Sequence, residues 1–337
     1  MWHFKPEMRP YRFTGHKAGV TDVCYSPSGD MLASASKDET IRLWQNSVEG
    51  KSVVIRAHSA AIRTVSFSQD GLRLLTGSDD KCLKVFSVAD RKFQFSLSGH
   101  SNWIRSARFS PDARLVASGS DDRSVKLWDV TQKDCLHTFL DHTDTVYCVR
   151  FHPDGTCVAA GSADMKVKIW DVRSQRLLQH YDAHSDAVSM ISFHPSGLYL
   201  LSSSADSAVK IWDLRQGQLL YTLYGHERGV TAVNWSAKGD YFATGGVDSL
   251  VMVWRSNIDI AADFGAETAD DLINSRRPTK SPTRRKVPGG TATRPQPSTE
   301  PLVVESVAPE ALTSSQLPAE LSECVEKIVS QLDLVTK

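Results

Sequence analysis

Short segments in which apolar and polar residues alternate follow one another through roughly the first three quarters of the chain. The first segment of each group begins four residues after a histidine, as at 20–25 and 62–67. Alternation with a period of two is typical of a strand that buries one face. Turn sequences such as Pro27-Ser28-Gly29 separate the segments, because glycine and proline favour tight turns. Four such segments recur in each group, which predicts four short strands per group.

Three marker residues recur at a constant interval of 42 residues. The histidines are His16, His58, His100, His142, His184 and His226. The aspartates, 22 residues further on, are Asp38, Asp80, Asp122, Asp164, Asp206 and Asp248. The aromatic residues, 28 after each histidine, are Trp44, Phe86, Trp128, Trp170, Trp212 and Trp254. Three positions that keep register through six copies indicate a repeated structural unit.

The marker residues, with the pairs Gly15-His16 and Trp128-Asp129, resemble WD repeats over residues 11 to 254. Four strands in each 42-residue unit correspond to one blade of a β-propeller. We therefore expect an all-β WD-repeat propeller over residues 8–256, with six complete four-stranded blades. One period before Trp44 lies Trp2, which we interpret as the relic of a seventh repeat at the N-terminus. We expect residues 9–14 to pair beside the strand ending at Trp254 and close the ring. The alternative is an open seven-bladed ring with an exposed strand edge.

The WD resemblance implies a structural role for the marker residues, since in such repeats they form a hydrogen-bonded chain with a serine or threonine. The matching sets are His16–Ser34–Asp38–Trp44, His100–Ser118–Asp122–Trp128, His184–Ser202–Asp206–Trp212 and His226–Thr244–Asp248–Trp254. Phe86 and Ala160 break the pattern in two repeats, so we expect softer blades there. A catalytic Ser-His-Asp triad is rejected, because six copies at blade-building positions would mean six active sites.

Composition and short motifs favour a non-enzymatic, soluble protein. Lys+Arg and Asp+Glu both number 39, so net charge draws the chain to neither nucleic acid nor membrane. No apolar run approaches the ~18 residues of a membrane span, and the N-terminus is not a secretory signal. The six scattered cysteines form no CxxC pair, which indicates a reducing compartment without disulfides or zinc. No nucleotide-binding or catalytic motif occurs, so we expect no enzyme activity, cofactor or metal.

Beyond the repeats the composition changes twice. Residues 257–318 are rich in proline, serine and threonine and predict a disordered linker. The linker contains a basic run from Arg276 to Arg294, which is either a solvated charge block or a site for an acidic polymer. Ser281, followed by proline, resembles a site for a proline-directed kinase. Residues 319–337 place apolar residues at alternating steps of four and three, which predicts the start of a coiled-coil helix that could self-associate.

The closing segment 326–336, together with blade segments such as 193–197 and 252–257, resembles the proteome-of-centriole-one family of centriolar WD-repeat proteins. This resemblance implies a scaffold in centriole assembly, centriole integrity and cilium formation. It also implies protein partners among centriolar and microtubule-associated components, and a location at the cytoskeleton, centrosome and basal body. Two other classes stay open. One is a substrate-recognition adaptor of a ubiquitin-ligase or signalling complex, and the other is a nucleic-acid binder using the basic run, which the balanced charge makes the less favoured.

The propeller fold also implies where partners would bind. Residues three and five after each histidine, and the one before each aspartate, lie on the top face of such a propeller. The large residues at these positions fall together in the second to fourth repeats: Arg63, Trp103, Arg105 and Tyr147, rimmed by Asp79 and Asp121, with Lys37 in the first repeat. Aromatic and arginine side chains dominate protein-binding hot spots. We predict a protein-binding patch there, against the alternative of ordinary surface variation.

Overall fold

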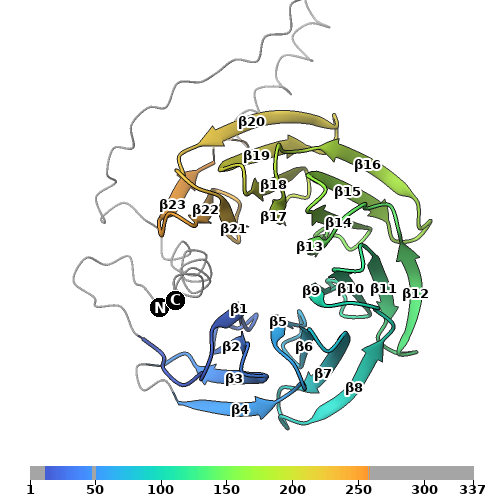
Figure 1. Ribbon diagram of the computed structural model, residues 1–337, viewed down its shortest axis with the longest axis vertical. Coiled ribbons are helices and arrows are strands. Elements are labelled where there is room, and N and C mark those ends of the chain that lie inside the picture. The colour runs from blue at the N-terminus through green and yellow to red at the C-terminus, as the bar shows by residue number, and fades with distance from the viewer. Residues whose placement is uncertain (1–11, 48–50, 257, 259–337) are drawn as a thin grey trace, which may run out of the picture. The chain divides into compact units, whose positions relative to one another are not determined.

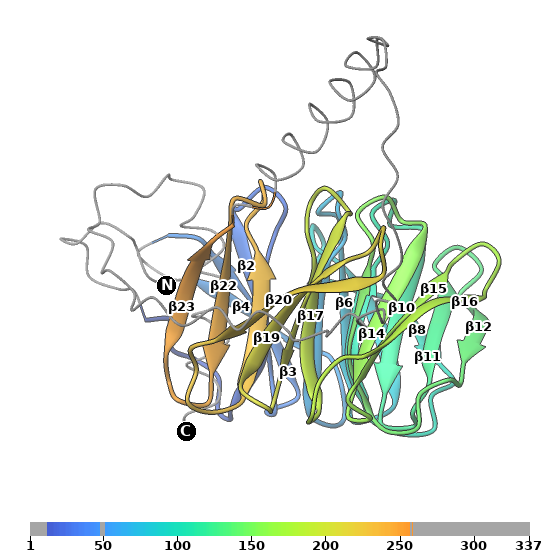
Figure 2. The same cartoon turned by 90° about the horizontal axis from the view of Figure 1, so that it is seen from above.

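The computed structural model describes residues 12–47, 51–256 and 258. These residues form six antiparallel sheets arranged radially around a central axis, as Figure 1 shows. The six-bladed all-β propeller predicted from the repeat is confirmed. In each sheet the strands follow one another in chain order from the axis outwards. The sheets stand side by side when the ring is viewed edge-on (Figure 2).

Each blade takes its strands from one repeat. The first blade has β1 (Val20–Tyr25), β2 (Met31–Ser36), β3 (Thr40–Gln45) and β4 (Ser52–Arg56). The second has β5 (Ile62–Phe67), β6 (Arg73–Ser78), β7 (Cys82–Ser87) and β8 (Phe93–Ser98). The third has β9 (Ile104–Phe109), β10 (Leu115–Ser120), β11 (Val125–Asp129) and β12 (Asp134–Phe139).

The second half of the ring repeats this plan. The fourth blade has β13 (Val146–Phe151), β14 (Cys157–Ser162), β15 (Lys166–Asp171) and β16 (Leu177–Asp182). The fifth has β17 (Val188–Phe193), β18 (Tyr199–Ser204), β19 (Ala208–Asp213) and β20 (Gln218–Tyr224). The sixth has β21 (Val230–Trp235), β22 (Tyr241–Gly246) and β23 (Val251–Arg255).

The core lies between neighbouring blades, where apolar side chains of two sheets interdigitate. Leu75 and Leu83 of the second blade, for example, pack in one cluster with Ile104 and Trp128 of the third. The second strand of each blade is the most buried, and it carries small residues that let the next blade approach closely. The outermost strands are largely exposed. Burial of apolar area between blades is therefore the main force that holds the ring together.

The ring closure predicted from the sequence is not found among the described residues. The innermost strands of consecutive blades contact each other from β1 to β21, but no comparable contact joins β21 back to β1. In the described part of the chain the sixth sheet has three strands, with β23 at its edge. Residues 12–14 form no strand, and residues 9–11 lie outside the described part. Phe13 instead packs against Trp44 of the first blade, at 5.4 Å between ring centroids, because its apolar ring finds an aromatic partner there.

Several predictions from the sequence fall on residues that the structure does not describe. These are the linker at 257–318 apart from Ile258, with its basic run and Ser281, and the helix at 319–337. Of the six cysteines, the five in the described part are all free thiols. Among the described residues, no helix is long and apolar enough to cross a membrane, and no group of three His, Cys, Asp or Glu side chains could hold a metal ion.

Candidate protein-binding face of the propeller

The repeated histidines and aspartates are joined inside the blades. In the third blade the indole N–H of Trp128 donates to the Ser118 hydroxyl at 2.8 Å. The Nε2 atom of His100 lies 2.7 Å from the same hydroxyl, and its Nδ1 atom lies 2.8 Å from the Asp122 carboxylate. The arrangement fits a neutral histidine that donates from Nδ1 and accepts at Nε2. The same connections recur in the first, fifth and sixth blades.

Each repeated aspartate also fixes the backbone of a turn. One oxygen of Asp122 accepts the backbone N–H of Ser101, and the other accepts that of Ser124. Arg123, which lies between Asp122 and Ser124, has a φ of 68°, a left-handed conformation that residues other than glycine rarely adopt. The carboxylate thus stabilises a strained turn as well as the histidine, and equivalent positive φ angles follow the other five aspartates.

These contacts shift the pKa values of the repeated aspartates and histidines. Burial alone would raise the pKa of Asp164, but hydrogen bonds and the charge of His142 prevail and lower it to about 2. The pKa of Asp122 is lowered in the same way. Burial lowers the pKa of His184 below its ordinary value, although the nearby Asp206 carboxylate opposes this. Near neutral pH the aspartates are therefore charged acceptors and His184 is neutral. The hydrogen-bonded chain therefore links the strands of a blade to the turn that holds the aspartate.

The second and fourth repeats, which depart from the pattern, have different hydrogen-bond partners at these positions. In the second blade Thr76 still contacts His58 and donates to the Lys84 carbonyl, while Phe86 packs edge-on against Phe93. In the fourth blade Ala160 offers no hydroxyl, and the Trp170 indole donates to Asp141 instead.

The Trp170 indole N–H lies 2.7 Å from the Asp141 carboxylate, and, because Ala160 has no hydroxyl, the buried Nε2 atom of His142 has no hydrogen-bond partner among the described residues.

The residues predicted for the top face come together in the second to fourth blades. Arg63 donates to Asp79 from Nε and Nη2, with contacts of 2.7–3.1 Å. Arg105 donates to Asp121 from Nε and Nη2, at 2.6 and 2.7 Å. The hydrogen bond with Asp121 raises the pKa of Arg105 above its ordinary value. Two-point contacts of this kind fix the plane of each guanidinium.

Trp103 lies close to both of these arginines. The guanidinium carbon of Arg63 is 5.6 Å from the centre of the Trp103 ring, and that of Arg105 is 5.5 Å from it. Arg105 also lies 6.0 Å from the Tyr147 ring. Cation–π contacts at these distances hold the four side chains in one arrangement. We call Arg63, Trp103, Arg105 and Tyr147 the top-face cluster.

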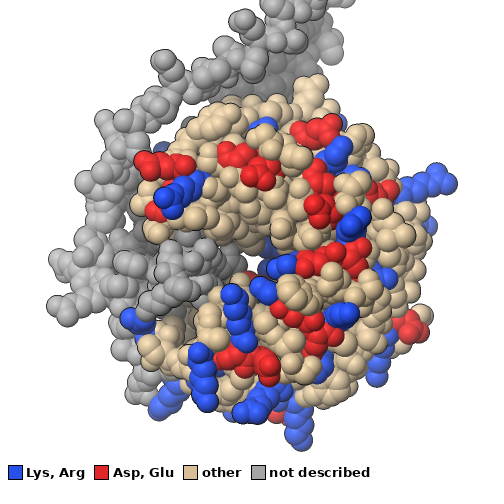
Figure 3. All heavy atoms as spheres, in the orientation of Figure 1, with Lys and Arg blue, Asp and Glu red and all other residues tan. Residues whose placement is uncertain are grey.

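The top-face cluster is accessible from solvent. Trp103 is 42% exposed and Tyr147 is 38% exposed, whereas five of the other six tryptophans of the described part are buried and Trp254 is partly buried. Figure 3 shows acidic and basic side chains interspersed around the central opening on the side of β5, β9 and β13. Lys37 is exposed on the first blade, and the structure places it in no contact with the cluster. The four residues of the cluster and the two aspartates that pair with its arginines therefore account for six of the seven predicted residues.

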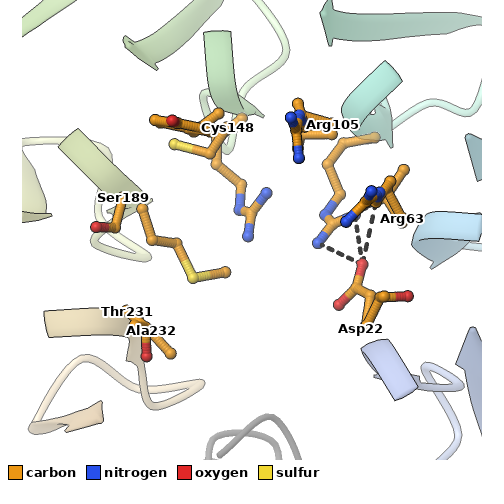
Figure 4. Close-up of a pocket in the computed structure, with 14 residues that line it drawn as sticks. Asp22, Arg63, Arg105, Cys148, Ser189, Thr231 and Ala232 are labelled. Carbon is orange, nitrogen blue, oxygen red and sulfur yellow. Dashed lines mark hydrogen bonds and ion pairs between the residues drawn. The ribbon is translucent and has the colours of Figure 1, made fainter. Parts of the chain in front are cut away.

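A second group of polar residues, which was not predicted, lines the central channel beneath this face. Asp22 accepts hydrogen bonds from the Thr64 hydroxyl and from the Val65 N–H, both at 3.0 Å. Arg108 reaches across from the third blade and lies 3.4 Å from the Asp22 carboxylate. Figure 4 shows Asp22, Arg63 and Arg105 on one side of the channel and Ser189 and Thr231 on the other.

The sequence carried a signal for this channel. Residues six and eight after each histidine lie on the innermost strands, and the two series run Asp22, Thr64, Ser106, Cys148, Met190, Ala232 and Cys24, Ser66, Arg108, Arg150, Ser192, Asn234. A carboxylate and two guanidiniums at positions that are small or apolar elsewhere could have indicated a polar channel.

Comparisons with known proteins agree with this architecture. A model of the WD domain, G-beta repeat matches residues 8–45. The protein is thus a WD-repeat propeller, a class that is generally non-catalytic and typically serves as a scaffold for protein interactions. A second model, described as nucleolar protein 10-like, N-terminal domain, matches residues 32–252, and the chain belongs to this β-propeller family. No curated protein matches the sequence.

Proposed function

We propose that the protein is a non-enzymatic scaffold that binds a partner protein through the top-face cluster. The observation that carries this proposal is the contact of the Trp103 ring with the guanidiniums of both Arg63 and Arg105, which are themselves fixed by carboxylates. Large side chains that are already fixed in one conformation before the partner binds lose little conformational entropy on binding. Aromatic and arginine side chains in such a setting contribute most of the binding energy in protein interfaces.

We further propose that the partners are centriolar or microtubule-associated proteins and that the protein acts in centriole assembly, centriole integrity and cilium formation. Support comes from the segments 193–197, 252–257 and 326–336, which resemble centriolar WD-repeat proteins. On this proposal the chain resides in the cytoplasm at the centriole, centrosome and basal body. The coiled-coil helix that the sequence predicts at 319–337 would add self-association.

The first experiment tests the cluster. Full-length tagged chain with Trp103→Ala and Arg105→Ala is compared with wild type in pull-downs and in recruitment to centrioles. Loss of a hot spot of about 2 kcal/mol weakens binding roughly 30-fold, so capture of partners should fall sharply. The matched control is Tyr221→Ala with Tyr224→Ala on the exposed outer strand β20, which should bind as wild type does. Unchanged capture by the Trp103/Arg105 variant contradicts the binding role.

The second experiment tests location. The tagged full-length chain and a version lacking residues 319–337 are imaged in ciliated cells beside centriolar and nucleolar markers. The proposal expects a centriolar signal for the full chain and a weaker one without the helix. A nucleolar signal with none at centrioles rules out the centriolar role, while leaving the scaffold role of the top face to the first experiment.

A further inference from the structure

Two cavities of the propeller share a pair of arginines. The first, of about 160 Å³, is lined by residues of all six innermost strands, including Asp22, Arg108 and Arg150. The second, of about 370 Å³, is lined by Phe67, Phe109 and Phe151 among others, and again by Arg108 and Arg150. The two arginines occupy equivalent positions on the neighbouring strands β9 and β13. Both cavities thus open onto the same two guanidiniums.

The charges around the first cavity do not balance. Four arginines line it, but Asp22 is the one acidic side chain among the lining residues. Arg63 and Arg105 are neutralised by Asp79 and Asp121 at the rim. The fourth, Arg150, forms no ion pair with any described carboxylate.

The remaining arginines differ in their partners. Arg108 is paired with Asp22 and also donates to Thr64 at 2.7 Å. Arg150 donates one hydrogen bond from its side chain to a described residue, from Nη1 to the Val149 carbonyl at 2.9 Å. A guanidinium has five N–H donors, so most of those on Arg150 have no hydrogen-bond partner among the described residues, and Arg150 lines both cavities.

Arg150 is nevertheless charged at neutral pH. Burial, and then the like charge of Arg108, lower the pKa of Arg150 to about 10, which is still well above neutrality. The Arg150 side chain is partly buried. A guanidinium that is incompletely solvated and lacks an acidic partner is stabilised by a bound anion. The first cavity exceeds by about tenfold the ~10–15 Å³ that one water molecule needs, so an oxyanion and its water fit.

We propose that the central channel is a binding site for an oxyanion, with the Arg150 guanidinium as its principal ligand. Arginine matches the paired oxygens of phosphate and carboxylate groups better than it matches a spherical ion such as chloride. The hydroxyls of Ser106 and Ser189 line the same cavity and supply neutral hydrogen-bond donors. The proposal does not depend on the top-face cluster, because the rim arginines already have their carboxylates.

Two sources of the anion are distinguished by two probes. Inorganic phosphate represents a free anion, and N-acetyl-glutamate amide represents an acidic side chain that a partner inserts into the channel. Each is titrated into the full-length chain by calorimetry at constant ionic strength, with chloride as the balancing anion. We expect saturable binding of one of the probes with one site per chain, and a rise in Tm as the probe concentration increases.

Variants at Arg150 test its role. Arg150→Gln should weaken binding of the probe at least tenfold, and Arg150→Lys should weaken it less because the charge is kept. Arg176→Gln, which removes an exposed arginine on the loop between β15 and β16, should bind as wild type does. Circular dichroism checks that each variant is folded, and Arg150→Lys serves if the glutamine variant is not. Absence of saturable binding of either probe to wild type, or equal binding by folded Arg150 variants, overturns the proposal.

Discussion

The indole N–H of Trp170 donates to the carboxylate of Asp141 at 2.7 Å, where the other tryptophans of the repeat donate to a serine or threonine. Asp141 immediately precedes His142, at a position that is Gly99 in the third blade. Ala160 stands where the other repeats have a serine or threonine. In the fourth blade the acceptor for the tryptophan N–H therefore lies on a loop, whereas in the other blades that have this tryptophan it lies on the second strand. The Trp170 side chain itself is almost fully buried.

Asp141→Ala should lower the free energy of unfolding by about 1–3 kcal/mol, because the buried Trp170 N–H loses its acceptor. Asp141→Asn keeps a carbonyl acceptor and should cost less. Asp141→Gly combined with Ala160→Ser installs the arrangement of the third blade and should recover most of the loss. Urea unfolding at pH 7 measures all three. A loss below about 0.5 kcal/mol for Asp141→Ala, or no recovery in the double variant, would argue against this account.

Gly119→Ala should destabilise the protein by about 1–3 kcal/mol through overpacking between the third and fourth blades. A Cβ at Gly119 would lie 2.6 Å from Cγ1 of Val146, on a strand that cannot move without shifting its sheet. Gly19→Ala is the matched control, since its Cβ would meet only the flexible Lys37 side chain at 3.9 Å. Thermal unfolding of both variants should show a lower Tm for Gly119→Ala alone. Equal Tm values would mean that the blades are not tightly apposed there.

How much of this structure the sequence predicts depends on whether a residue obeys the repeat. The strands, and hydrogen-bonded sets such as His100, Ser118 and Asp122, could be predicted from the 42-residue spacing, because the same contacts within a blade recur in each repeat. The top-face cluster was also predictable, since its positions are set by the same register. Contacts between repeats are different. Arg108 pairs with Asp22 across 86 residues, and no periodic pattern specifies such a pair.

The ends of the repeat array were predicted least well. The pattern around residues 9–14 resembles a strand, and pairing with the last blade would have hidden an edge. In the structure residues 12–14 form no strand and Phe13 packs on Trp44, while residues 9–11 lie outside the described part, so the pairing stays a prediction there. Asp141 was missed for a related reason, because the repeat treats its position as a spacer rather than as an acceptor.

Acidification should destabilise the propeller in two stages. The pKa of His16 and that of His184 are lowered by burial, so below pH about 6.5 the unfolded chain takes up protons first and stability falls. The pKa values of aspartates such as Asp122 and Asp164 are also lowered in the folded state, so a second loss follows below pH about 4. Each proton contributes a slope of at most about 1.4 kcal/mol per pH unit.

Urea midpoints between pH 7.5 and 3.5 measure this dependence. His184→Gln should be less stable than wild type at pH 7.5 but should show a shallower decline between pH 6.5 and 5, because one titrating group is gone. The Arg176→Gln variant, altered on an exposed loop, should keep the wild-type slope. Stability that rises on acidification, or a slope that His184→Gln leaves unchanged, would show that the buried histidines do not control it.

Removing the top-face cluster should change stability far less than it changes binding. Arg105 and Asp121 form a two-point ion pair at the surface, with side chains 25% and 13% exposed, and such exposed pairs contribute about 0.2–1 kcal/mol. Trp103 buries little more than half of its surface, and its cation–π contact with Arg105 adds about 0.5–1 kcal/mol. A double-mutant cycle of Trp103→Ala and Arg105→Ala, followed by urea unfolding, should therefore give a coupling free energy of no more than about 1 kcal/mol. A coupling of several kcal/mol would mean that these two side chains serve mainly to stabilise the third blade, and a loss of partner capture could then be a consequence of unfolding.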